Sequence, residues 1–183
     1  GSTGTPPGGD TYGGPRYPTN DPDDLTEAGA RDLFLSLWSM DNFGDDLLAC
    51  HSGEGTIWWW DIDAPIVFDN STQTATAPTK LTNSPASNIA VLVTPERHIM
   101  ALGAEGNHRV IQWASQESLT DWAPTLVNTA GDLELQTKGR IIGGFKTRYG
   151  ILVFTNVDCW KTNYLGPPYV YGVERLTEGG GPA

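Results

Sequence analysis

Five acidic side chains are the residues in this sequence that could form a catalytic pair: Asp61, Asp63, Glu105, Glu117 and Asp121. Glycoside hydrolysis, the reaction they would suit, needs two carboxyl groups across one cleft. All five fall near the ends of apolar runs that read as strands, where carboxylates are usually solvated. Their spacing places no two of them in one cleft, so we predict no catalytic residues and no enzyme activity.

The histidines show no metal-binding pattern. None of His51, His98 and His108 is paired with another histidine, a cysteine or an acid at ligand spacing on one element, so we expect ordinary strand-end residues. The glycine-rich stretches at 52–55 and 141–145 lack the lysine and the helix of a phosphate-binding loop. We therefore expect neither a metal nor a cofactor.

The charge balance argues against a general nucleic-acid-binding protein. The net charge is −11 and the pI is about 4.5, and the sequence shows no basic patch or stripe. An acidic surface favours solubility and disfavours anionic partners. It still allows a passive path for DNA, where weak contact is an advantage.

Composition indicates an all-β fold of one domain. The 22 Gly and 13 Pro imply many turns, while 7 Trp, 6 Tyr and 5 Phe imply a packed aromatic core rather than disorder. Cys50 and Cys159 lie in apolar strand-like runs, so we expect buried free thiols and no disulfide. No membrane span or signal peptide is visible, and both ends read as cut, as in a mature product or a part of a longer chain.

Short strands separated by turns follow one another in three groups of four. We expect strands at 33–40, 47–51, 56–61 and 66–70, then at 88–94, 98–103, 109–115 and 133–137, then at 140–145, 149–155, 157–165 and 169–176. Only the connection after Trp113 is expected to be long. Residues 1–24 read as an extended Gly/Pro-rich arm or linker, and 177–183 as a flexible end.

The three groups align as weak repeats about fifty residues apart. The third strand of each carries a tryptophan: Trp59, Trp113 and Trp160. Four antiparallel strands per repeat form a β-propeller blade, and a broad side chain fills the wedge between blades. We therefore predict propeller blades over 25–176, with a β-sandwich as the alternative. Three blades are too few to close, so the chain is expected to be part of a larger propeller.

The stretch "TIWWWD" (56–61) has two aromatic faces. In a strand, Trp58 and Trp60 point one way and Trp59 the other, so one face should be core. We expect the other face to be an interface between blades or subunits, with a carbohydrate platform as the alternative.

The segment "RVIQWASQESLTDWAP" (109–124) resembles the recurrent blade segment of bacteriophage tail-hub proteins, in which Arg-x-x-Trp-Ser precedes a polar loop and Asp-Trp-x-Pro. The matching residues are Arg109, Trp113, Ser115, Asp121, Trp122 and Pro124, with Ser115 one place later than in that pattern. Residues 91–103, 36–61 and 8–18 are similar to other parts of those proteins, and the likeness covers most of 8–175.

This resemblance implies a structural component of a bacteriophage tail, the propeller-bearing hub or nozzle, also described as a packaged-DNA stabilisation protein. It implies a homo-oligomeric ring, usually of six subunits, below the portal and adaptor proteins in the virion. Such a ring extends the DNA channel, helps to retain the packaged DNA until ejection, and offers attachment sites for tailspikes, fibres or a needle. The alternative is a carbohydrate-binding or carbohydrate-active propeller. A full hub has more blades and a platform region, which this chain lacks.

The residues give two further expectations for the segment. We predict that Trp113 is a buried wedge between blades and that Trp122 packs back over the same blade. We also predict that the Asp121 carboxylate holds the loop by accepting hydrogen bonds from backbone N–H groups.

Overall fold

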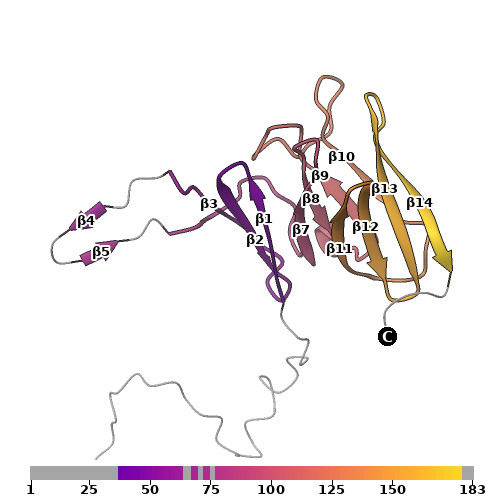
Figure 1. Ribbon diagram of the computed structural model, residues 1–183, viewed down its shortest axis with the longest axis horizontal. Helices are drawn as coiled ribbons and strands as arrows, with labels where there is room; N and C mark the ends of the chain where they lie inside the picture. Colours follow the sequence, from indigo (N-terminus) through magenta and orange to yellow (C-terminus); the bar gives the residue numbers. More distant parts are fainter. Residues whose placement is uncertain (1–36, 64–66, 70–71, 75–76, 179–183) are drawn as a thin grey trace, which may run out of the picture. The chain divides into compact units, whose positions relative to one another are not determined.

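The computed structural model describes residues 37–63, 67–69, 72–74 and 77–178 (Figure 1). The chain divides into two units, Gly1–Phe34 and Leu35–Ala183, and all the described residues belong to the second. The predicted arm at 1–24 lies outside them, as does most of the predicted flexible end.

Three four-stranded antiparallel sheets and one two-stranded sheet are found among the described residues. The strands of each four-stranded sheet pair in chain order, and the two-stranded sheet is inserted between the third and fourth strands of the first. The first sheet contains β1 (Trp38–Phe43), β2 (Asp46–His51), β3 (Ile57–Trp60) and β6 (Thr79–Lys80). The second contains β7 (Ala90–Val93), β8 (Ile99–Leu102), β9 (Val110–Trp113) and β10 (Gly131–Glu134), with a 3-10 turn, η1 (Ala104–Gly106), between β8 and β9. The third contains β11 (Ile141–Thr147), β12 (Gly150–Thr155), β13 (Asp158–Gly166) and β14 (Val170–Glu178). The predicted all-β fold with three four-stranded units is confirmed.

The predicted strand at 66–70 is present, but its predicted place as the fourth strand of the first group is wrong. Val67–Asp69 forms β4 and pairs with β5 (Thr72–Thr74) in a separate two-stranded sheet. The edge of the first sheet is β6, which pairs with β3. Both β6 residues are exposed and polar, so this edge strand has no hydrophobic alternation that a sequence could show. The connection from β3 to β6 is therefore a second long one, besides the expected one after Trp113.

Several strand ends also differ from the prediction. β1 continues to Phe43 through a stretch expected to be a turn, because Phe43 is buried and the Asp41 carboxylate accepts a hydrogen bond from the Val93 N–H at 2.7 Å. The turn is confined to Gly44 and its neighbour, and Gly44 has a φ of +72°, which favours glycine. β14 likewise runs to Glu178, past the predicted boundary at Leu176.

The second sheet lies between the other two and is buried on both faces. Its alternate residues enter two separate hydrophobic cores, one shared with the first sheet and one with the third. The face toward the first sheet carries Val91, Val93, Ile99 and Ala101. The face toward the third sheet carries Leu92, Met100, Leu102, Ile111 and Trp113. Every residue of β7 and β8 is buried as a result.

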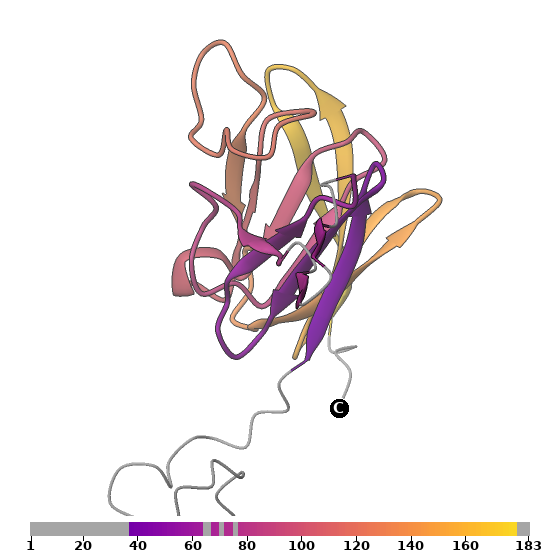
Figure 2. The same ribbon diagram turned by 90° about the vertical axis from the view of Figure 1, so that its left-hand side faces the viewer.

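The first strands of the three sheets lie side by side, with β7 between β1 and β11 (Figures 1 and 2). The Ser39 hydroxyl accepts a hydrogen bond from the Val91 N–H at 2.8 Å, which joins β1 to β7. On the other side, Leu92 packs against Gly144 of β11 so closely that a Cβ at Gly144 would lie 3.0 Å from it. Each sheet therefore stacks on the next with first strand beside first strand. The three sheets do not close into a ring.

Candidate functional site

The three repeated tryptophans lie on the third strands, as predicted. Each indole N–H donates a hydrogen bond to an acceptor. The acceptors are the Asp46 carboxylate for Trp59 at 2.9 Å, the Thr129 carbonyl for Trp113 at 2.8 Å and the Asp158 carboxylate for Trp160 at 2.9 Å. Trp113 is only 3% exposed and packs in the core between the second and third sheets. The predicted burial of Trp113 is confirmed, and its side chain lies between two of the four-stranded sheets.

The orientation of these tryptophans does not repeat strictly. Trp59 packs against the core between the first and second sheets, so it faces the following sheet, as Trp113 does. Trp160 belongs to the same core as Trp113 and therefore faces the preceding sheet. The tryptophan of the third sheet is therefore turned inward and does not lie on the outer face of that sheet.

The loop between β9 and β10, residues 114–130, folds back over the core shared by the first and second sheets. We call this loop the clasp. Trp122 is 2% exposed and packs in the core shared by the first and second sheets, so it covers its own sheet and also contacts its neighbour. The predicted role of the Asp121 carboxylate is wrong: both of its oxygens accept hydrogen bonds from the Asn128 side-chain amide, at 2.9 and 3.0 Å. Asn128 then ties the loop together by donating to the Ala123 carbonyl.

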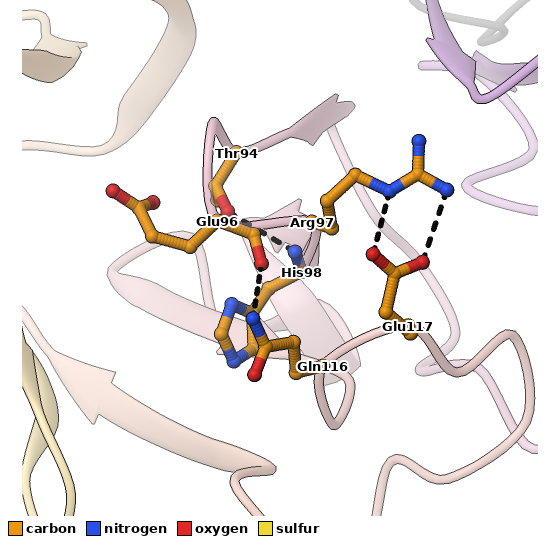
Figure 3. Close-up of polar contacts among 6 residues, drawn as sticks. All are labelled: Thr94, Glu96, Arg97, His98, Gln116 and Glu117. Carbon is orange, nitrogen blue, oxygen red and sulfur yellow. Dashed lines mark hydrogen bonds and ion pairs between the residues drawn. The ribbon is translucent and has the colours of Figure 1, made fainter.

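The carboxylates of three of the other acids, Asp61, Glu105 and Glu117, accept hydrogen bonds or form an ion pair. The Asp61 carboxylate accepts a hydrogen bond from the Asp63 N–H at 3.0 Å, and Glu105 accepts one from the Ala86 N–H at 3.2 Å. Glu117 forms a two-pronged ion pair with Arg97, with N–O distances of 2.9 and 3.0 Å (Figure 3). These contacts give the acids structural tasks in turns. In the described part of the chain, no group of three or more His, Cys, Asp or Glu could hold a metal ion.

A polar network ties the turn between β7 and β8 to the start of the clasp (Figure 3). The Gln116 amide donates to the Glu96 carbonyl at 3.0 Å, and the His98 N–H donates to the Thr94 hydroxyl at 3.1 Å. Both Arg97 and Glu117 have positive φ, 67° and 56°, so their ion pair spans two tight turns.

His98 lies at the centre of a buried polar cluster that links the second and third sheets. It is fully buried, and its ring nitrogens lie 3.0 Å from the Tyr171 hydroxyl and 3.1 Å from the Thr129 hydroxyl. Tyr171, on β14, also donates to Thr94 or Glu96, at 2.7 and 3.2 Å. Since His98 and Tyr171 are far apart in sequence, no local pattern could have shown this cluster.

Burial sets the protonation of these groups. It lowers the pKa of His98, an effect that the Glu96 and Glu117 carboxylates oppose, and it raises the pKa of the Tyr171 hydroxyl. Both side chains are therefore neutral near pH 7. Burial also raises the pKa of the Cys50 thiol to about 12, and Cys50 and Cys159 are free and buried, as predicted. A neutral histidine without access to solvent suits a structural link better than acid–base chemistry.

The pH dependence of stability should report on His98. Its pKa is lower in the folded state, so below the ordinary value of about 6.5 the unfolded state binds the proton more readily. Stability is then fully present above that value and falls as the pH drops below it, by at most about 1.4 kcal/mol per pH unit. Tyr171, Tyr164, Glu96 and Glu117 are the titratable groups around the ring.

Urea unfolding of wild type and of His98→Gln between pH 8 and pH 5 measures this contribution. The wild type should lose more stability on acidification than the variant. His108→Gln, a change at an exposed histidine, is the control and should keep the wild-type slope. Equal slopes for wild type and His98→Gln would contradict the assignment.

The outer face of the first sheet is mostly apolar and uncovered by any described residue, with the polar side chains of Asn42, His51 and Lys80 at its margins. We call it the tryptophan face; it carries Trp38, Met40, Leu47, Ala49, Trp58 and Trp60. Trp38, Met40 and Trp60 are 57%, 64% and 44% exposed. A hollow of about 210 Å³ opens among Trp38, Trp58, Trp60 and Pro78, with only apolar lining. The predicted division of "TIWWWD" is confirmed, since Trp59 faces the core and its two neighbours face outward.

The outer face of the third sheet is also uncovered by described residues. We call it the phenylalanine face; it carries Phe145, Leu152, Phe154, Lys161 and Glu174. Phe145 is 65% exposed and contacts the Phe154 ring edge-on, with centroids 5.9 Å apart. No pattern in the sequence indicated this face.

A basic hollow lies where two loops meet beside β9 and β11. It is lined by Glu105, Gly106, Asn107, His108, Arg109, Lys138, Gly139 and Arg140. Arg109 forms an ion pair with Glu134 and donates to the Thr137 carbonyl, so part of the positive charge is compensated. The sequence shows no basic patch because these cations come from separate segments.

No helix among the described residues is long and apolar enough to cross a membrane. No protein-family model, curated protein or solved structure matches the chain.

Proposed function

We propose that the protein is a structural component of a bacteriophage tail, part of a hub or nozzle ring below the portal and adaptor. In this role it extends the DNA channel, helps to retain packaged DNA and provides attachment surfaces for tail appendages. We also propose that its three sheets are blades of a β-propeller. The order of the sequence motifs in 8–175 supports the family, and three successive meanders with adjacent first strands support the propeller.

The observation that carries the proposal is the stack of three sheets, whose two outer faces each expose large apolar side chains beside charged ones. A protein that works by assembly needs such faces, because exposed apolar patches rimmed by polar residues are typical of association surfaces. The buried polar groups within the stack serve as links between sheets. A net charge of −11 further supports a channel wall along which DNA slides without being gripped.

The carbohydrate alternative has one observation in its favour, the exposed Trp38 and Trp60 on one face of the first sheet. Sugars, however, are held by a combination of apolar contacts and several converging polar groups. The hollow beside these tryptophans has no polar lining, which suits a protein surface better than a glycan.

Purified virions of the phage that carries this sequence provide the test. We expect mass spectrometry to find the protein in intact particles and immunogold labelling to place it at the portal vertex. A nonsense mutant should yield heads that lose their DNA, with at least a tenfold drop in infectious titre. Absence from purified particles would contradict the proposal, and polysaccharide hydrolysis by the pure protein would favour the alternative.

A further inference from the structure

We infer that the phenylalanine face of one copy docks on the tryptophan face of a second copy, so that the sheet stack continues from molecule to molecule. This inference rests on the proposed structural role and adds to it the partner and the two surfaces. The partner is a second copy of this chain, and the contact is head to tail, because the two surfaces are different.

The stacking inside the molecule supplies the first argument. The first sheet packs its inner face on the second, and the second packs its other face on the third, each time with first strand beside first strand. The tryptophan face is the free face at the start of this stack, on the first sheet. The phenylalanine face is the free face at its end, on the third sheet. Joining them repeats an arrangement that the chain already uses twice.

Cross-strand rows supply the second argument. Residues that pair across strands share a face, so the tryptophan face contains one complete row across β1, β2, β3 and β6: Met40, Ala49, Trp58 and Lys80. The corresponding row on the phenylalanine face, across β11, β12, β13 and β14, is Phe145, Leu152, Lys161 and Glu174.

The two rows are complementary when the sheets are stacked strand on strand, with β11 over β1, β12 over β2, β13 over β3 and β14 over β6. Phe145 would meet Met40, and the larger Leu152 would meet the small Ala49. Lys161 would lie over Trp58, a favourable cation–π pair, and Glu174 would meet Lys80. The apolar Phe145 and Leu152 thus lie opposite apolar residues. At the outer edge, the negative Glu174 lies opposite the positive Lys80.

Sedimentation velocity of the full chain over micromolar to high-micromolar concentrations tests the contact. The wild type should form species that grow with concentration, and added salt should promote growth by screening the net charge. Met40→Asp and Phe145→Asp, at side chains 64% and 65% exposed, should each weaken association by about tenfold or more without unfolding the protein. Circular dichroism checks the fold.

Leu126→Asp is the matched control. Leu126 is fully exposed in the loop between β9 and β10, away from both rows, and the substitution changes the charge by the same amount. This variant should associate like wild type. A loss as large as that of Phe145→Asp would mean that charge, and not the surface, is responsible.

Mixing the two single variants distinguishes head-to-tail docking from a symmetric contact. Met40→Asp retains an intact phenylalanine face and Phe145→Asp an intact tryptophan face, so an equimolar mixture should give a dimer that cannot grow. In a second arm, Lys80→Glu and Glu174→Lys should each weaken association, and together in one chain should restore it.

A wild-type protein that stays monomeric at several hundred micromolar, or a mixture that gives no dimer, would overturn the inference. These results would leave the proposed function standing, because detection of the protein in virions does not depend on this contact. Conversely, head-to-tail association of a protein absent from virions would support the surfaces and remove the tail role.

Discussion

Replacing Trp113 with alanine is expected to lower the free energy of unfolding by about 3–5 kcal/mol. The ring fills the core between the second and third sheets and contacts Tyr171 edge-on, with centroids 5.2 Å apart. It also lies against Gly131, where a Cβ would come within 2.5 Å of it. The truncation therefore leaves a cavity between two sheets and removes the partner of the Thr129 carbonyl.

Chemical unfolding monitored by circular dichroism measures this loss. Trp38→Ala is the matched control, because Trp38 is 57% exposed and its removal should change stability by less than about 0.5 kcal/mol at concentrations where the protein is monomeric. If the two variants had equal stability, Trp113 would not be the wedge that we describe.

Replacing Trp122 with alanine is expected to cost a similar amount, about 3–5 kcal/mol, but through the other core. Trp122 packs with Leu48 and Ile57 of the first sheet and with Ile99 of the second, and its indole N–H donates to the Leu119 carbonyl at 3.0 Å. Its removal should both open that core and loosen the clasp.

Limited proteolysis separates these two effects. In Trp122→Ala the loop at 114–130 should be cut faster than in wild type. In Trp113→Ala, although the loss of stability is similar, cleavage at this loop should increase less. Trp122→Phe keeps most of the apolar volume and loses only the hydrogen bond, so it should lose clearly less stability than the alanine variant. Unchanged stability in Trp122→Ala is the outcome that would refute the clasp.

Local pattern was enough to predict most of the strands. The alternation around Trp113 and the recurrence of Trp59 and Trp160 at the same place in each group gave the third strands and the three-fold repeat. Alternation with a period of two also separated Trp59 from its neighbours, and the structure confirms that division. These features depend only on residues close in sequence.

Features that depend on distant residues were missed. β6 consists of Thr79 and Lys80, two exposed polar residues, so no hydrophobic signal marks this edge strand. Periodicity also cannot say which neighbouring sheet a face meets, which is why the reversed orientation of Trp160 was not foreseen. The contact of His98 with Tyr171 and the complementarity of the two outer rows required the three-dimensional pairing of the strands.

The two-sided burial of the second sheet has a consequence for synthesis. The first and second sheets leave the ribosome before the third, so they can pack together while Leu92, Met100 and Trp113 still lack a cover. At about 5–20 residues per second, the third sheet follows on the order of a few seconds later. During that interval the nascent chain exposes the apolar face of the second sheet. At this stage the chain is most prone to associate wrongly with another nascent chain.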